Sequence, residues 1–411
     1  MNAVRGTPSW LGGVNDRTAV SLLLERGELT KNQISELSGL SKPTASLIVG
    51  RLEAVGIIRA VGEVPGTRGP SAVSYAVRAD RILGVAINIS HLVMQSTVVD
   101  AYGTEHPVAE TSLSAAASER SAVFDITAGI HSACVASNLS PDAVQMVCIG
   151  VQGSVDSRTD ALNYVDLLPG WQRKGIKEHL EEALGLDVFM ENDVNLAAIA
   201  EREYGAGADT ASFALLWMGE GLGLAVDLNG SVLHGASGGA GEIGFLPTPH
   251  SAANFGSTAK NLQELVGGVG VSKVAKSHGL SKRGYQALFE ALVDDPRGDA
   301  IFAELAPRIA VGIIPVLAVL DPARVVLGGP LGSAGGSRLA KLVQSAIRRD
   351  SVWVPEVVAT TVPDRPVLRG AVTFLVAEVR EALIKDVSSA APKFTNHSTL
   401  HDHQHHPLQR K

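Results

Sequence analysis

Cysteine is almost absent from this chain of 411 residues, which contains only Cys134 and Cys148. Each lies within an apolar stretch, so the pair offers neither a disulfide framework nor a cysteine zinc site, and buried reduced thiols are expected. The chain also lacks a run of about 18 uncharged apolar residues, and its first residues, MNAVRGTPSW, lack the charged and apolar segments of a secretion signal. These absences predict a cytoplasmic protein that does not span a membrane.

Acidic residues outnumber basic residues in the whole chain, but the balance differs between its two ends. The net charge is −7, and the first 80 residues, with nine Lys or Arg and seven Asp or Glu, carry +2 and leave −9 for the remainder. A small basic end on an acidic body is typical of a nucleic-acid-binding domain joined to a domain with another kind of ligand. With 45% apolar residues, the chain is long enough for two or three domains that each bury a core.

Residues 17 to 54 carry the pattern of three short helices. Apolar residues at helical spacing in RTAVSLLLER predict a first helix, which Gly27 ends. The segment from Thr30 to Gln33 fits a capping box for a second helix, and Ser38-Gly39-Leu40 predicts the turn after it. Ser41 is placed to cap a third helix, SKPTASLIVGRLEAVG.

The third helix divides into an apolar face and a polar face, as a DNA recognition helix does. The polar and cationic side chains expected at base edges and phosphates are Lys42, Thr44, Ser46 and Arg51. Two strand-like runs follow, joined by GEVPGTRGPS, and they predict a wing with Arg68 at its tip, where it could enter a minor groove. The alternative interpretation is a three-helix module that binds protein.

Beyond residue 80, apolar strands alternate with helices and glycine-rich turns. VQMVCIGVQGSVD indicates a strand that ends in a loop, and DVFMEND indicates a further strand before a helix. Asn229-Gly230 is a strong signal for a two-residue hairpin turn, and an apolar helix is expected from about Ile301 to Leu320. This order predicts an α/β body of two lobes, with ligand groups in a cleft at the strand ends.

Six motifs of this body occur in the order and spacing of one known family. They are IGVQGSVD (149–156), LLPGW (167–171), MENDVNLAAIAERE (190–203), GEGLG (219–223), GGAGEIGF (238–245) and LDPARVVLGG (320–329). With these motifs the chain resembles, from about residue 82 to 385, the ROK family of bacterial sugar kinases and sugar-responsive transcriptional repressors. The resemblance implies an actin-like, ribonuclease H-like ATPase fold, and the winged helix selects the repressor branch.

The expected fold class is therefore α/β, with an N-terminal winged helix-turn-helix followed by a two-lobed ROK domain. The predicted segments are a flexible N-terminus (1–14), the DNA-binding domain (15–79), the ROK domain (80–385) and a disordered, histidine-rich tail (386–411). The predicted lobes of the ROK domain are about 80–195 with the C-terminal helix 366–385, and about 196–365.

The resemblance also implies a set of residues near a bound sugar. In a kinase of this fold, a carboxylate at a strand end takes the proton from a sugar hydroxyl as that oxygen attacks ATP, and Asp193 has that position. Asn192 and Asp193 equally suit the cap of the helix that follows them. The full set expected to bind an effector is Asn192, Asp193, Glu242, Gly153 and Glu264.

Two departures from the family pattern affect this set. Phe245 stands where the family has His, and a phenyl ring neither hydrogen-bonds a hydroxyl nor holds a metal. The family's cysteine-rich zinc loop is replaced by HSAANFGSTAKNLQELV, so no metal is expected. The remaining sugar-binding glutamate of the family corresponds to Gln263 by strict alignment, or to Glu264 after a slip of one residue.

The segments that correspond to the family's nucleotide-binding motifs depart further from the family pattern. The family's first phosphate motif is Asp-x-Gly-Gly-Thr, in which the Asp binds a metal and the glycines bring N–H groups to phosphate. The same stretch here is Ala86-Ile87-Asn88-Ile89-Ser90, with neither the carboxylate nor the glycines. The second loop keeps Gly219, Gly221 and Gly223 but has Glu220 in place of Thr, and its charge repels a triphosphate.

We therefore expect a DNA-binding transcriptional regulator of the repressor type that is not an enzyme and needs no cofactor. Its expected partners are operator DNA and a sugar or sugar derivative, and a homo-oligomer would present two recognition helices to a pseudo-palindromic operator. Two alternatives stay open. One is an ATP-dependent sugar kinase with an attached DNA-binding domain, and the other is a regulator whose body is only a dimerisation or protein-docking scaffold.

Overall fold

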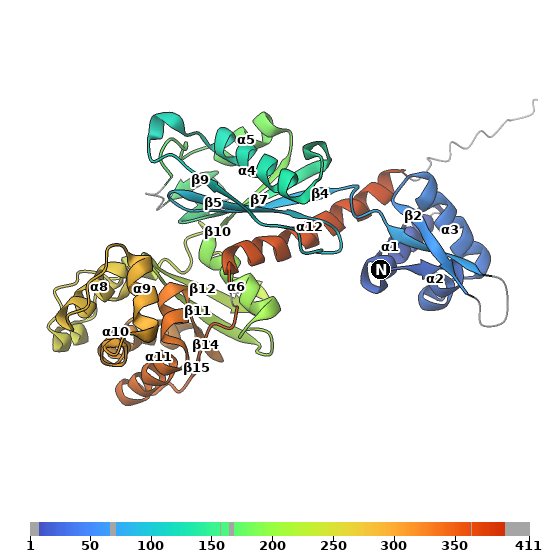
Figure 1. Cartoon of the computed structure of the whole chain (residues 1–411). Helices are drawn as coiled ribbons and strands as arrows, with labels where there is room; N and C mark the ends of the chain where they lie inside the picture. The colour runs from blue at the N-terminus through green and yellow to red at the C-terminus, as the bar shows by residue number, and fades with distance from the viewer. Residues whose placement is uncertain (1–7, 66–70, 157, 164–167, 363, 391–411) are drawn as a thin grey trace, which may run out of the picture. The chain divides into compact units, whose positions relative to one another are not determined.

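The computed structural model describes residues 8–65, 71–156, 158–163, 168–362 and 364–390 (Figure 1). The chain forms two compact units. One comprises Met1–Arg81 with Arg380–Lys411, and the other comprises Ile82–Val379. The domain boundaries expected from the sequence stay a prediction.

The first unit joins three helices to a small antiparallel sheet. Its elements are α1 (Pro8–Arg26), β1 (Leu29–Thr30), α2 (Lys31–Ser38), α3 (Lys42–Ala54), β2 (Ile58–Val64) and β3 (Ala72–Val77), with strand order β1-β3-β2. The predicted capping box is confirmed, because Thr30 Oγ1 accepts from Gln33 N and Gln33 Oε1 accepts from Thr30 N at 2.8 Å. Ser41 caps α3 as predicted. These caps fix the turn that sets α3 against α2.

Both ends of the chain are more helical than the sequence suggested. α1 begins at Pro8, inside the segment 1–14 that was expected to be flexible. At the other end, α12 (Pro366–Ala390) continues past residue 385, because Asp386 binds the Arg81 guanidinium at 2.6 Å and Val387 is buried. The helix therefore includes the first five residues of the segment 386–411 that was expected to be a tail, and residues 391–411 lie outside the described residues.

The second unit contains two five-stranded sheets. The first has the strand order β10-β7-β4-β5-β6. Its strands are β4 (Leu83–Ile89), β5 (Val93–Val99), β6 (Ala109–Ser112), β7 (Val144–Val151) and β10 (Asp187–Asn192). Strands β4, β7 and β10 are parallel, whereas β5 and β6 continue as an antiparallel meander. Helices α4 (Ala122–Ser137) and α5 (Ile176–Leu184) cover one face, and α12 covers the other (Figure 1).

Small residues let helices approach the α12 face of this sheet closely. A Cβ atom on Gly150 of β7 would lie 2.8 Å from Leu196 Cδ1 and 2.9 Å from Val367 Cγ1. A Cβ on Gly84 of β4 would lie 3.2 Å from Leu375 Cδ1. Because a side chain at Gly150 has no space, the packing of α6 (Asp193–Tyr204) and α12 beside β7 depends on this glycine.

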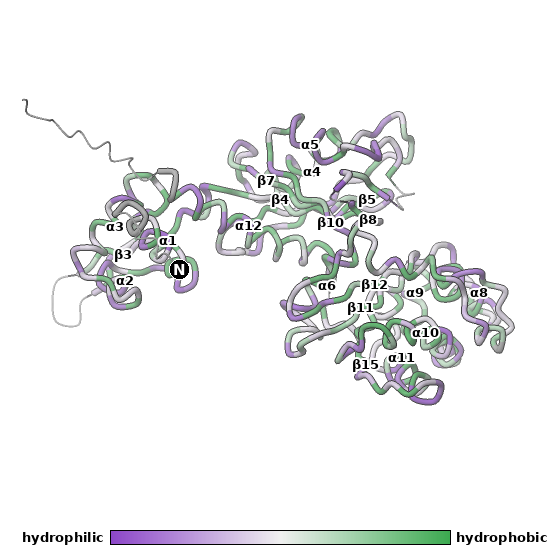
Figure 2. Tube along the Cα trace, turned by 180° about the vertical axis from the view of Figure 1, so that it is seen from behind, coloured by the Kyte–Doolittle hydropathy of each residue, from purple (hydrophilic) through white to green (hydrophobic). Residues whose placement is uncertain are grey.

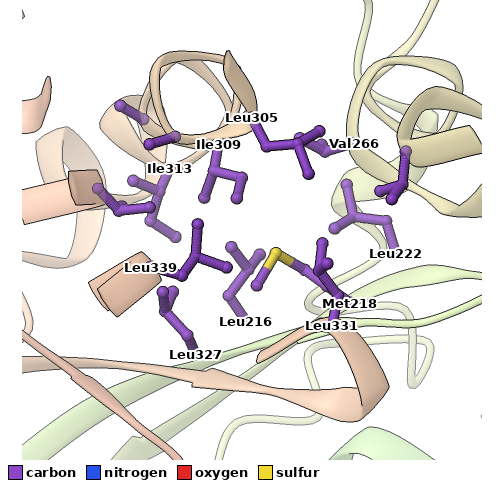
Figure 3. Packing of buried hydrophobic residues seen from close by; sticks show 14 of the residues in the cluster. Leu216, Met218, Leu222, Val266, Leu305, Ile309, Ile313, Leu327, Leu331 and Leu339 are labelled. Atoms are coloured by element: carbon purple, nitrogen blue, oxygen red, sulfur yellow. The ribbon is translucent and has the colours of Figure 1, made fainter. Parts of the chain in front are cut away.

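The second sheet has the order β13-β12-β11-β14-β15 and supports most of the remaining helices. Its strands are β11 (Ser212–Met218), β12 (Leu222–Leu228), β13 (Ser231–Val232), β14 (Arg324–Gly328) and β15 (Glu356–Ala359). Its helices are α7 (Leu262–Val266), α8 (Gly268–Ser277), α9 (Tyr285–Asp294), α10 (Gly298–Leu320) and α11 (Gly329–Asp350). Leu216 and Leu327 of the sheet pack against Ile309 of α10 and Leu339 of α11 (Figure 3). The predicted turn at Asn229-Gly230 is confirmed between β12 and β13.

Shorter elements lie between these strands and helices along the chain. They are the strands β8 (Ser154–Asp156) and β9 (Ala161–Asn163) and the 3-10 helices η1 (Ala117–Glu119), η2 (Pro141–Ala143), η3 (Ile243–Phe245) and η4 (His250–Phe255).

Helix α10 is the most apolar helix of this core. Among the described residues it is the one helix long and apolar enough, by length and composition, to cross a membrane. It lies within the core of the second unit, where Phe302, Ile309 and Ile313 are fully buried, and Figure 2 shows it as hydrophobic along most of its length. Its apolar composition is accounted for by this packing.

A buried ion pair fixes Trp171, the last residue of the LLPGW motif, against α4. Arg120 Nη2 lies 2.9 Å from Asp125 Oδ2, and both side chains are at most 2% exposed. The indole N–H of Trp171 donates to the same carboxylate oxygen at 2.8 Å, and Arg120 Nη1 donates to the carbonyl of His91. Asp125 thus neutralises a buried cation and fixes the ring of Trp171.

We predict that Asp125→Ala destabilises the second unit by about 3 kcal/mol, because it leaves the Arg120 guanidinium buried without a counter-charge. Calorimetric unfolding of the full chain should show a lowered midpoint for this unit. Glu182→Ala, which removes an exposed carboxylate from α5, should leave that midpoint unchanged. Equal midpoints for the two variants would contradict the role assigned to Asp125.

Candidate functional site

Helix α3 presents an exposed polar surface at its N-terminal end. Lys42 and Ser46 are exposed, and no ion pair with Lys42 occurs among the described residues. Thr44 is half-buried, and its hydroxyl lies 2.8 Å from the Ser41 hydroxyl, so part of its hydrogen-bonding capacity supports the helix cap. Lys42 and Ser46 are therefore the predicted DNA contacts that the structure leaves most accessible.

Arg51 is engaged in a contact within the first unit. Its Nη2 lies 2.5 Å from Asp16 Oδ1, and its Nε donates to Asp16 Oδ2 at 3.3 Å. Asp16 is 3% exposed, so this bidentate pair joins α3 to α1 and compensates a buried carboxylate. The structure thus gives Arg51 a structural partner, in addition to the DNA contact predicted for it. Arg68 lies outside the described residues.

Two residues on α3 that the sequence reasoning missed share the exposed surface with Ser46. Leu47 is 66% exposed although it is apolar, and Gly50 has no heavy atom within 4 Å of a Cβ position. An exposed leucine suits contact with a thymine methyl group, and a glycine allows close approach of a phosphate backbone. Leu47 could have been found from its place on the helix, because it lies off the face formed by the buried residues Ala45, Ile48, Val49 and Leu52.

In the second unit, the β10–α6 junction is organised by the Asn192 amide. Its Oδ1 accepts from the backbone N–H groups of Val194 (2.8 Å) and Asn195 (3.0 Å), and its Nδ2 donates to the carbonyl of Gly153 at 2.8 Å. Gly153 adopts a φ of 114°, which disfavours other residues. Asn192 and Gly153 therefore position the junction, and the capping interpretation of Asn192 is confirmed.

Asp193 follows at the first position of α6, and its carboxylate is electrostatically coupled to Glu242. The pKa of Asp193 is raised to about 7, chiefly by burial and to a lesser degree by the charge of Glu242. The pKa of Glu242 is also raised by burial. Glu242 precedes η3, and no hydrogen bond to its carboxylate occurs among the described residues. The Asp193 carboxylate accepts one backbone hydrogen bond, from Val194 N at 2.9 Å, and its remaining acceptor sites and the Glu242 carboxylate suit a hydroxyl-rich ligand.

The two candidates for the remaining sugar-binding glutamate both have structural partners. Glu264 Oε2 accepts from the backbone N–H of Lys260 at 3.0 Å, which closes the N-terminal cap of α7. Gln263 Oε1 accepts from Leu222 N at 2.7 Å, and its Nε2 donates to the carbonyl of Glu220 at 3.1 Å. Through these two hydrogen bonds, Gln263 joins α7 to the turn between β11 and β12.

A second network beside Asn192 was not predicted from the sequence. Glu191 Oε1 accepts from Asn192 N and from Asn195 Nδ2, both at 2.8 Å, and Glu191 Oε2 lies 2.7 Å from His234 Nε2. This contact with Glu191 raises the pKa of His234. Glu191 belongs to β10 of the first sheet and His234 follows β13 of the second, so the pair links the two sheets. Phe245 lies at the end of η3 and is 62% exposed.

The expected phosphate loops have other roles in this fold. Strand β4 runs through Ala86 to Ile89, and both of these side chains are buried. At the second loop, a Cβ on Gly223 would lie 2.7 Å from Val194 Cγ2, so packing against α6 alone requires this glycine. The carbonyl of Glu220 accepts from Gly268 N at 3.1 Å, which anchors α8 to the loop.

Comparison with protein families identifies both parts of the chain. A model of the ROK family matches residues 107–378, which is well over half of the sequence. The chain belongs to the ROK family. A winged helix-turn-helix DNA-binding model matches residues 15–59, within the first unit. The architecture is thus the expected winged helix-turn-helix followed by an actin-like sugar kinase fold.

ROK relatives include both repressors and kinases. The xylose repressor of Caldicellulosiruptor bescii is 20% identical over 403 residues, covering 91% of this chain and 98% of that protein. The glucokinase of Halalkalibacterium halodurans is 29% identical over 217 residues, covering 48% of this chain and 64% of the glucokinase. The crystal structure of a ROK family transcriptional regulator, a homologue of the E. coli MLC protein, has a TM-score of 0.68 at 18% identity, covering 92% of this chain and 99% of that one.

We predict that Lys42→Ala weakens DNA binding and lowers the slope of log affinity against log salt by about 1, because one phosphate contact is lost. Arg51→Ala should instead lower the free energy of unfolding of the first unit by about 2 kcal/mol, and with it the unfolding midpoint, because Asp16 is left buried without its partner. Salt-dependent fluorescence anisotropy and calorimetry measure the two effects. Arg26→Ala, in the last turn of α1, is the matched charge control. A normal salt slope for Lys42→Ala would exclude its phosphate contact.

We predict that Asp193→Asn stabilises the second unit more at pH 8 than at pH 5. The folded state raises the pKa of Asp193 to about 7, so it favours the neutral acid, and stability falls as the pH rises from about 4 through 7. Asn does not ionise, so the variant avoids this loss. The difference in unfolding midpoint between the variant and the unchanged protein, measured at both pH values, tests this prediction. Asp187→Asn, at the exposed start of β10, is the control. The same midpoint difference at both pH values would contradict the assigned pKa.

Proposed function

We propose that the protein is a DNA-binding transcriptional repressor whose ROK domain binds a sugar or sugar derivative, and that this ligand releases the operator. The observation that carries the proposal is the presence, on one chain, of a winged helix-turn-helix and a ROK domain with the paired carboxylates Asp193 and Glu242. The xylose repressor that aligns over nearly its whole length supports the same combination. A protein that binds chromosomal DNA acts in the cytoplasm of a bacterial cell.

The proposed operator-binding surface is the exposed side of α3. Lys42 supplies a phosphate contact, Ser46 a polar contact with a base edge and Leu47 an apolar one. Thr44, Arg51 and Arg68 complete the proposed set. A homodimer would place two such surfaces on a two-fold symmetric operator, with half-sites separated by whole turns of DNA.

The proposed effector contacts centre on Asp193 and Glu242. A carboxylate accepts hydrogen bonds from vicinal hydroxyl groups, and a sugar that donates to both would relieve their mutual repulsion. Asn192 and Gly153 hold the site in shape, and Glu264 contributes from the start of α7. Phe245 offers an aromatic face against which the apolar side of a sugar ring could pack.

Ligand binding changes DNA affinity only if the sugar binds two conformations of the protein differently. Asp193 lies at the end of the first sheet, whereas Glu242 belongs to a loop beside the second. A sugar held by both carboxylates favours the arrangement in which they are closest. The chain connects the two units twice, at residues 81–82 and within α12, so a change in the second unit has two covalent routes to the first.

A second candidate function is an ATP-dependent sugar kinase, and one observation favours it. The pKa of Asp193 near 7 suits a general base at neutral pH. Against it, Ala86 provides no metal-binding carboxylate, Ile89 fills a buried position where the family has glycine, and Glu220 adds a negative charge near the expected phosphates. We therefore propose that the protein is not an enzyme.

The test is operator binding by the full chain, measured by fluorescence anisotropy with the DNA upstream of its own gene and a panel of sugars. At least one sugar should weaken binding, and Asp193→Asn and Glu242→Gln should each reduce the apparent sugar affinity about tenfold or more, since a charged hydrogen bond is lost. Both variants should still bind DNA. Asp187→Asn should respond as the unchanged protein does.

Three outcomes would contradict the proposal. Absence of any sugar effect would favour a body that serves only as a scaffold. An unchanged sugar response in Asp193→Asn and Glu242→Gln would place the effector elsewhere. Sugar-dependent consumption of ATP in a coupled assay would establish the kinase instead.

A further inference from the structure

We propose that the groove between α8 and α9 binds a small phosphorylated molecule, at a site separate from the carboxylate pair. The groove has a volume of about 370 Å³ and is lined by α8, by the loop after it and by the start of α9. Pockets that bind small molecules have volumes from about 300 Å³ upward, so this groove is large enough for a small organic molecule.

The sequence around the groove has an unusual charge pattern for this chain. Between Glu264 and Glu290 there is no carboxylate, whereas Lys273, Lys276, Lys282 and Arg283 all occur there. The chain outside its first 80 residues carries a net charge of −9. A cationic segment within such an acidic body indicates a local preference for an anion.

Three of these cations converge on the groove. Lys273 and Lys276 are three residues apart on α8 and therefore lie on the same side of the helix, and Lys282 comes from the loop before α9. In the part of the chain that the structure describes, no ion pair satisfies any of the three lysines. Like charges placed together repel, so this arrangement does not serve the stability of the fold.

One acidic residue near Lys282, Asp295, has another cationic partner. Asp295 lies close enough to Lys282 that the lysine helps to lower its pKa, but the main cause is Arg297. The Asp295 carboxylate is bound to Arg297 through two contacts, at 2.7 and 2.8 Å. Asp295 therefore leaves Lys282 available for the anion of a ligand.

The rest of the lining suits a ligand with an uncharged organic part. Leu280 and Leu288 are buried and Val269 is half-exposed, so they form an apolar base. Tyr285 is half-buried, and its ring packs closely on Gly268, where a Cβ would lie 2.7 Å from Tyr285 Cδ1. Ser272 and Ser281 add hydroxyl groups. Lysines beside hydroxyls and a ring favour a phosphate ester of a small polyol over a bare ion.

The groove is also connected to the candidate effector site. Gly268, at the start of α8, donates to the carbonyl of Glu220, and Gln263 binds the same carbonyl. Gln263 belongs to α7, and α7 contacts η3, which directly follows Glu242. A ligand that moves α8 would therefore displace the segment that carries Glu242, so the groove is placed to act as a second, allosteric effector site.

Isothermal titration of the full chain tests this, with glucose 6-phosphate, ribose 5-phosphate and inorganic phosphate as probes and glucose as the uncharged comparison. At least one phosphate ester should bind at millimolar or lower concentration. The variant Lys273→Ala with Lys276→Ala should weaken that binding about tenfold or more, because two charge-assisted contacts are lost. Lys341→Ala, which removes an exposed lysine of α11, should have no effect.

Asp193→Asn separates this proposal from the proposed function. Ester binding that survives Asp193→Asn but not the double lysine variant supports the groove, whether or not glucose binds. Ester binding lost only in Asp193→Asn would place the ester at the carboxylate pair and overturn the inference. Failure of every ester to bind would overturn it as well. Reduced operator affinity of the double variant, with no ester binding, would make the groove a DNA contact instead.

Discussion

The Asn192 amide is the constraint on which the candidate effector site depends. It ends β10, caps α6 and holds Gly153 through a single side chain. Because the cap fixes the first turn of α6, it also fixes where the next residue, Asp193, points its carboxylate. Without this anchor the burial that raises the pKa of Asp193 would not be imposed, and the coupling between Asp193 and Glu242 would weaken.

The local features of the fold were predictable because they depend on residues close together in sequence. The Thr30 capping box, the Ser41 cap and the Asn229-Gly230 turn each need only a few adjacent residues, and all were confirmed. The family motifs placed Asp193 and Glu242 in one site through their order and spacing. The electrostatic coupling between these two carboxylates is consistent with that placement.

What the sequence did not reveal involves partners that are distant in the chain. Arg51 was predicted to contact DNA as a cationic side chain of the third helix, and the structure adds a partner, Asp16, on another helix. Glu191 and His234 meet only when the two sheets are assembled. The roles of Gln263 and Glu264 were also undetermined, because one residue of alignment decides which side chain faces which partner, and the structure gives each a backbone contact.

We propose that this ROK domain binds its ligand without phosphoryl transfer, because of the substitutions in the expected phosphate motifs and the preserved carboxylates Asp193 and Glu242. The central claim is that sugar and operator are bound by one chain with coupled affinities. Linkage requires the coupling to be reciprocal. Isothermal titration of the effector sugar into the full chain, alone and saturated with operator DNA, tests it most directly. The account predicts weaker sugar binding to the DNA complex, by the factor with which sugar weakens DNA binding. Equal sugar affinities with and without DNA would contradict it.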